Sequence, residues 1–187
     1  MVVKNQGEPT MNAGYQEKIR EYVTGFHLPR YRELPDIGLR LEQVVRYVNR
    51  YAPSPITGYM VSNYVKQKLI PGPDKKSYGP ETIAYLIFVA YVKAVVSMDD
   101  IRLLMDVQRD SYSLSVAYDY FCDEFENLLQ FVCGLKQMPD RVGHDDTAEK
   151  ELLRTALLSI TYKVYLDQHL RMIREDLEKA PTAEEPS

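Results

Sequence analysis

The chain has 187 residues, 45% of them hydrophobic and 27% charged, a composition typical of a globular protein whose core needs no disulfide or metal. The longest uncharged run of the apolar middle, residues 82–92, is far below the roughly 18–20 residues that cross a bilayer, which excludes a membrane-spanning helix. The net charge of −4 is uneven: residues 1–109 carry 15 Lys and Arg against 11 Asp and Glu, whereas residues 110–187 carry 8 against 16, and this asymmetry points weakly to a nucleic-acid partner.

Helix breakers divide the chain. Seven of the eleven prolines lie between Pro29 and Pro80, and from residue 81 to residue 180 the only glycines or prolines are Gly134, Pro139 and Gly143. Because these residue types end helices, they predict one loop between two long helical stretches in the second half. The expected fold class is all-α, and the two chain ends, residues 1–10 and 181–187, are expected to be frayed.

Three helices are predicted before residue 69. The first covers about residues 12–24, and the second covers about residues 39–51 and ends before Pro53 and Pro55. The third covers about residues 57–68, with Thr57 as its N-cap residue. Apolar residues at 3.6-residue spacing give each helix one buried face.

A small wing-like hairpin is predicted next. Its two short extended pieces are Leu69-Ile70 and Lys76-Ser77-Tyr78, joined by a turn that is rich in proline and glycine. Pro80 then takes the favoured first-turn position of a helix over about residues 80–96, which is apolar on nearly every side and should be buried.

Three more helices complete the prediction. Ser97 caps one that ends near Arg109, and two longer ones cover about residues 111–135 and 145–179. The last has two apolar stripes separated by a phase slip, which a helical hairpin explains if one stripe packs on the preceding helices and the other on a second copy of the chain. The first stripe is Leu153, Leu157, Ile160 and Val164, and the second is Leu166, Leu170, Ile173 and Leu177.

The order of elements between residues 56 and 104 is the most informative feature. A helix capped by Thr57 is followed by Leu69-Ile70-Pro71, a basic segment Lys75-Lys76-Ser77-Tyr78, a helix that opens Pro80-Glu81-Thr82-Ile83, and the Ser97-capped helix. This stretch resembles the winged helix-turn-helix DNA-binding domain of MerR-type transcriptional regulators. The resemblance implies an N-terminal MerR-like winged helix-turn-helix followed by a C-terminal helical hairpin or bundle.

A longer stretch, residues 28–106, is similar to the YkrK-like bacterial family of unknown function. The chain departs from the MerR pattern in three respects: about 38 residues precede the helix-turn-helix, Asn63 stands where the first of two tyrosines is common, and no recognisable ligand-binding module follows. An effector therefore cannot be carried over from the resemblance, and a small-molecule effector remains an unidentified partner.

Ten residues are candidates for contact with double-stranded DNA. Short polar side chains on a recognition helix reach base edges, whereas lysines, hydroxyls and helix N-termini contact phosphates. The candidates are Thr57, Tyr59, Ser62, Asn63, Tyr64, Lys66, Lys68, Lys75, Lys76 and Tyr78. Two other interpretations stay open: the lysines solvate a surface turn, and Tyr64 is a core anchor.

These features predict a three-part organisation: residues 1–109 as the winged region with a helical extension, residues 110–180 as an acidic dimerisation hairpin, and residues 181–187 as a disordered tail. The expected function is a cytoplasmic transcriptional regulator that binds an inverted repeat as a homodimer. The alternative is a protein-interaction module built on the same scaffold.

No catalytic constellation, metal site or cofactor site is predicted. His27, His144 and His169 lie in separate segments, and the residues around Gly72 lack the spacing of a phosphate loop. Cys122 and Cys133 lie in an apolar stretch, and since no secretory leader opens the chain, they are expected to be core thiols of a reduced cytosolic protein.

Overall fold

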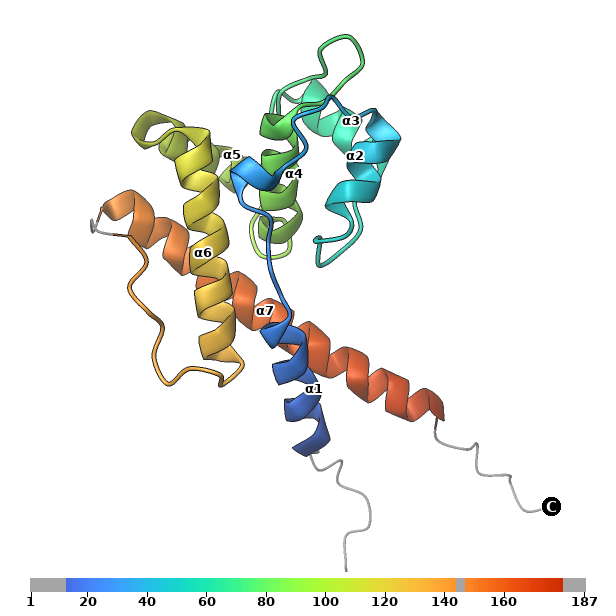
Figure 1. Ribbon diagram of the computed structural model, residues 1–187, viewed down its shortest axis with the longest axis vertical. Helices are drawn as coiled ribbons and strands as arrows, with labels where there is room; N and C mark the ends of the chain where they lie inside the picture. The colour runs from blue at the N-terminus through green and yellow to red at the C-terminus, as the bar shows by residue number, and fades with distance from the viewer. Residues whose placement is uncertain (1–12, 144–146, 180–187) are drawn as a thin grey trace, which may run out of the picture.

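The computed structural model describes residues 13–143 and 147–179, and these residues form seven α-helices and one short 3-10 helix without any β-strand (Figure 1). The expected all-α class is therefore confirmed. The predicted frayed ends, and the predicted start of the last helix at residue 145, lie outside the described residues. The elements are α1 (Ala13–Thr24), η1 (Tyr31–Glu33), α2 (Leu41–Val48), α3 (Gly58–Lys66), α4 (Pro80–Val92), α5 (Met98–Ser111), α6 (Leu114–Val132) and α7 (Ala148–Lys179).

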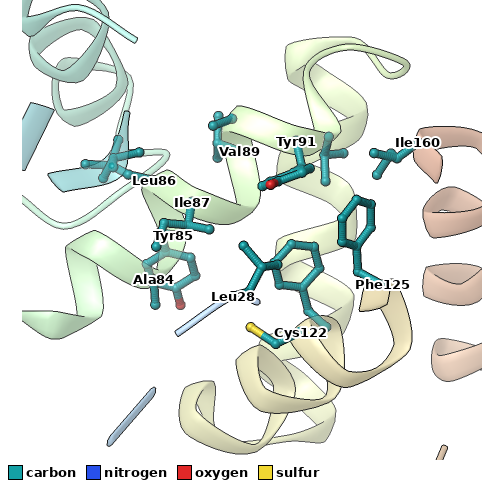
Figure 2. Packing of buried hydrophobic residues seen from close by; sticks show 14 of the residues in the cluster. Leu28, Ala84, Tyr85, Leu86, Ile87, Val89, Tyr91, Cys122, Phe125 and Ile160 are labelled. Carbon is teal, nitrogen blue, oxygen red and sulfur yellow. The ribbon is translucent and has the colours of Figure 1, made fainter. Parts of the chain in front are cut away.

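Helix α4 is the centre of the molecule. It packs against α2 on one side and against α6 and α7 on the other, and ten of its residues are buried, as its apolar sequence predicts. Pro80 stands at its first turn, and Tyr91 near its end donates a hydrogen bond of 2.5 Å to the backbone oxygen of Tyr51. Figure 2 shows α4 side chains meeting Phe125 of α6 and Ile160 of α7.

The core is continuous from the first helices to the last. The rings of Phe121 and Phe125 on α6 lie with centroids 6.1 Å and 4.8 Å, respectively, from that of Tyr91, so aromatic packing joins α4 to α6. Cys122 and Cys133 are buried free thiols in the same cluster, and burial raises their pKa values to about 12 and about 11. A thiol with so high a pKa is inert at neutral pH.

The segment after α1 is attached to α6 by charged hydrogen bonds. Arg30 donates to both carboxylate oxygens of Glu126, at 2.7 and 2.9 Å, and lies 2.7 Å from Asp123. The backbone N–H of Leu28 donates to Glu126 and that of Tyr31 to Asp119. The helical extension predicted for the first part of the chain therefore packs on the second part.

The predicted wing differs in its pairing. Asp74 pairs with Ser77 across a two-residue turn, and Leu39 pairs with Tyr78, so the partner of the Tyr78 segment lies before α2. Leu69 instead donates its backbone N–H to the carbonyl of Tyr64 and completes the end of α3. The extended piece predicted at Leu69-Ile70 is wrong for this reason, and α2 begins at Leu41 because Leu39 is engaged outside the helix.

The two apolar stripes of α7 have different surroundings. Leu157, Ile160 and Val164 of the first stripe are buried against α4 and α6. In the second stripe, Leu166 is 52% exposed and Leu177 is 70% exposed. This half of α7 lies beside α1 and extends away from the rest of the helices (Figure 1).

Candidate nucleic-acid interface

Helix α3 presents one apolar and one polar face. Val61 and Tyr64 are buried, whereas Tyr59, Ser62 and Lys66 are exposed. Since residues three and four apart share a helix face, the exposed three form one row. Asn63 lies beside this row and is half-buried. Tyr59 is the most open of the row, with 77% of its surface exposed.

The start of α3 is fixed by Thr57, as predicted. Its hydroxyl oxygen accepts a hydrogen bond of 3.2 Å from the backbone N–H of Met60, which leaves other N–H groups of the first turn open to an acceptor. A phosphate is an acceptor of the kind that helix N-termini bind.

The turn between α2 and α3 is held by Asn49. Its side-chain oxygen accepts from the backbone N–H of Ile56 at 2.8 Å, and its side-chain nitrogen donates to the carbonyl of Ile56 at 3.0 Å. This pair of hydrogen bonds joins the end of α2 to the residue before the N-cap of α3. Sequence reasoning missed Asn49, although an Asn just after a helix is a residue that commonly bonds nearby backbone.

The end of α3 is closed by a lysine in a left-handed conformation. The N–H of Leu69 donates to the carbonyl of Tyr64 and that of Lys68 to Val65, the pattern in which glycine is usual at the position of Lys68. The φ angle of Lys68 is 56°. This conformation costs an L-residue roughly 1–2 kcal/mol.

Lys75 and Lys76 adopt the same conformation in the next loop. Their φ angles are 46° and 69°, and the backbones of Asp74 and Ser77 exchange two hydrogen bonds across them, at 2.9 and 2.7 Å. Two consecutive positive φ values define the turn that favours Asn-Gly in hairpins. Among the described residues, all three non-glycine positive φ angles are therefore at lysines.

The loop is attached to the segment before α2. Leu39 and Tyr78 exchange backbone hydrogen bonds of 2.9 and 2.8 Å. Gly38 allows this approach, because a Cβ atom at residue 38 would lie only 2.6 Å from the Cβ of Ser77. Sequence reasoning missed Gly38.

Two of the ten candidate residues lie in the core. Tyr64 is 8% exposed and Tyr78 is 6% exposed, and burial raises the pKa of Tyr64. The interpretation of Tyr64 as a core anchor matches this burial. Thr57, Tyr59, Ser62, Lys66, Lys68, Lys75 and Lys76 are all exposed at the surface.

Two arginines of α5 donate hydrogen bonds to backbone carbonyls just after the end of α3. Sequence reasoning missed both. Arg102 donates to the carbonyl of Gln67 at 3.1 Å. Arg109 reaches the carbonyl of Leu69 at 3.5 Å and the hydroxyl of Tyr85 at 3.4 Å. Free carbonyls at a helix end attract cations. An Arg on α5, two helices further along the chain, gives no local sequence signal for these contacts.

Residues 29–121 match the model of a family described as a domain of unknown function, DUF1836. The matched region contains α2, α3, α4, α5 and residues 69–79, which carry Lys75 and Lys76 and are called the lysine loop below. It ends within α6, so it includes every candidate residue and leaves α1 and α7 outside. No curated protein and no solved structure matches the chain.

Neither a metal site nor a membrane-spanning helix occurs among the described residues. These residues contain no group of three His, Cys, Asp or Glu side chains arranged to hold a metal ion. None of the helices they form combines the length and apolarity needed to cross a membrane.

Proposed function

We propose that the chain is a sequence-specific DNA-binding transcriptional regulator of winged helix-turn-helix type. In this proposal α2 and α3 are the helix-turn-helix, the exposed row Tyr59, Ser62 and Lys66, together with Asn63, faces the major groove, and the lysine loop contacts phosphates.

The observation that carries the proposal is the conformation of the three lysines. Lys68, Lys75 and Lys76 stand where glycine or asparagine would be less strained, and each is exposed. Strain of this kind concentrates at functional positions. The segment between α3 and α4 begins at the end of α3 and lies beside that helix in Figure 1.

The binding form in the proposal is a homodimer on an inverted repeat. The support is the second stripe of α7, where Leu166, Leu170 and Leu177 remain exposed. Burying such a row against a second copy removes apolar surface from water. A two-fold dimer presents two copies of α3 to two half-sites.

The salt dependence of binding to duplex DNA tests the proposal. Replacing both loop lysines, Lys75→Ala with Lys76→Ala, should weaken binding to all sequences and flatten the slope of log affinity against log salt by about one to two units. The matched control is Lys18→Ala, an exposed lysine on α1, which should leave the slope unchanged. A double variant that binds like the wild-type protein would remove the loop from the interface.

A further inference from the structure

An apolar cavity lies behind the candidate interface, between α4, α5, α6 and α7. Its volume is about 80 Å³, and residues from all four helices line it. Ala84 and Phe88 of α4 and Phe121 of α6 contribute to its wall, with Leu104 and Met105 from α5 and Leu153 from α7. One water needs roughly 10–15 Å³ on the same measure, so the cavity is larger than a single water site.

Two polar side chains at this cavity are already engaged, whereas the buried hydroxyl of Tyr118, which also lines it, has no hydrogen-bond partner among the described residues. The side chain of Gln108 donates to the carbonyl of Tyr112 at 2.8 Å, and the ammonium group of Lys150 lies over the rings of Tyr112 and Tyr120, at 5.5 and 5.1 Å from their centroids. An apolar cavity of roughly 150 Å³ stays dry and binds benzene. A ring of that size therefore enters this smaller cavity only when the side chains around it move. Native cores contain few voids of this size because each one reduces stability.

The cavity touches the helix that supports α3. Leu104, Met105 and Gln108 line it from α5, and the same helix carries Arg102 and Arg109, which bind the carbonyls of Gln67 and Leu69. Tyr85 connects the cavity to Arg109, because it lines the cavity and its hydroxyl accepts a hydrogen bond from Arg109.

We propose that this cavity binds a compact apolar molecule about one aromatic ring in size, and that its occupancy shifts the end of α3 and the start of the lysine loop through α5. The ring occupies the space among the four helices. A ring that displaces Tyr85 or α5 changes the position of Arg109, and Arg109 donates to the carbonyl of Leu69, three residues after the end of α3. The regulatory meaning of this coupling rests on the proposed function, whereas binding itself does not.

Phenol is the probe for the experiment, with glycerol as the polar control. The full-length protein is labelled at methyl groups and amides and titrated without DNA. We expect saturable shifts of the Met105 and Leu153 methyl resonances with phenol and none with glycerol. Absence of a saturable shift with phenol would overturn the binding proposal, and because no DNA is present, this outcome leaves the proposed DNA binding untouched.

Two variants locate the site. Ala117→Phe places a ring at the half-buried lining residue Ala117 and should abolish the shifts, whereas Ala94→Phe adds the same ring at an exposed residue after α4 and should preserve them. Melting temperatures show whether both variants fold, and if Ala117→Phe does not, the wild-type titration still decides the proposal. Shifts that persist in a folded Ala117→Phe protein would overturn the assignment of the site.

A third variant tests the coupling. In the wild-type protein, phenol should shift the amide resonances of Gln67 and Leu69 with the same saturation curve as Met105. In Arg109→Ala, the Met105 shift should remain and the Leu69 shift should fall by at least half. Methyl shifts without any change at Leu69 in the wild-type protein would overturn the coupling.

Discussion

Lysine is an uncommon choice at a positive φ angle, and three of them occur here within nine residues. At Lys68 the conformation ends α3, and at Lys75 and Lys76 it closes the two-residue turn. Glycine or asparagine would form the same backbone at lower cost. The positive charge at these positions is therefore kept at the expense of stability.

This conflict between stability and binding gives the first prediction. The double variant Lys75→Asn with Lys76→Gly introduces the residue pair that the turn favours, so its free energy of unfolding should rise by about 1 kcal/mol. Its affinity for duplex DNA should fall, because the two phosphate contacts proposed for these lysines would be lost. Thermal melts and fluorescence anisotropy measure the two effects. A variant that is more stable and binds DNA as well as the wild-type protein would contradict a phosphate-binding role for the loop.

Asn63 gives the second prediction, which concerns sequence preference. It lies beside the exposed row of α3, where a side-chain amide can pair with the edge of an adenine. Asn63→Ala should therefore relax the preference for one base, with a loss of discrimination of about 1–3 kcal/mol at that position. The measurement is a binding-site selection with wild-type and variant protein. An unchanged base preference would exclude Asn63 from reading the sequence.

At the scale of elements, α6 and α7 are joined by a buried ion pair. Glu124 is fully buried on α6, and its carboxylate lies 3.0 Å from the guanidinium of Arg154 on α7. Burial raises the pKa of Glu124, and Arg154 opposes this rise by stabilising the carboxylate. Removing one partner of such a pair leaves an uncompensated buried charge.

Arg154→Ala should therefore destabilise the protein by roughly 3–5 kcal/mol at neutral pH. A carboxyl group whose pKa is raised by folding stabilises the folded state below its unfolded pKa and loses this contribution as pH rises through its folded pKa. At pH 4 the buried carboxyl of the variant is protonated and needs no cation, so Arg154→Ala should lower the free energy of unfolding less at pH 4 than at pH 7. Chemical denaturation at both pH values measures this difference. Arg171→Ala, on the exposed side of the same helix, is the control and should have little effect. An equal loss at both pH values would contradict the assignment to Glu124.

The helices were largely predictable from the sequence, whereas the contacts between them were not. Thr57, Pro80 and Ser97 mark helix starts through local hydrogen bonding and backbone geometry, and local signals are readable in a sequence. The pairing of Leu39 with Tyr78 joins residues far apart in the chain, so no local pattern identifies it. The same reason explains why Arg109 was missed, because its partner Leu69 lies 40 residues away, whereas Asn49 bonds Ile56 seven residues away and was an overlooked local signal.

The exposure of some candidate residues was predictable from the sequence, whereas the burial of others was not. The exposed row of α3 follows from helical spacing, and the structure has Tyr59, Ser62 and Lys66 on one face. The burial of Tyr78 depends on how the loop folds back, which the sequence does not reveal. The cavity behind α5 is made by four helices and has no sequence signal at all.

At the scale of the whole molecule, the exposed second stripe of α7 predicts a dimer. Wild-type protein should sediment as a dimer at micromolar concentration, and Leu166→Asp with Leu170→Asp should convert it to a folded monomer, because charges on the stripe oppose its burial. Leu103→Asp, at a 61% exposed leucine of α5, is the matched control and should remain dimeric. A wild-type monomer at high micromolar concentration would contradict the dimer.

The central claim is that the molecule binds DNA with sequence preference. The most direct test is to incubate the purified protein with a pool of random duplex DNA at two salt concentrations and to sequence the DNA that stays bound. We expect an enriched inverted repeat and an affinity that falls steeply with salt. Absence of DNA retention even at low salt would contradict it and favour a module that binds another protein.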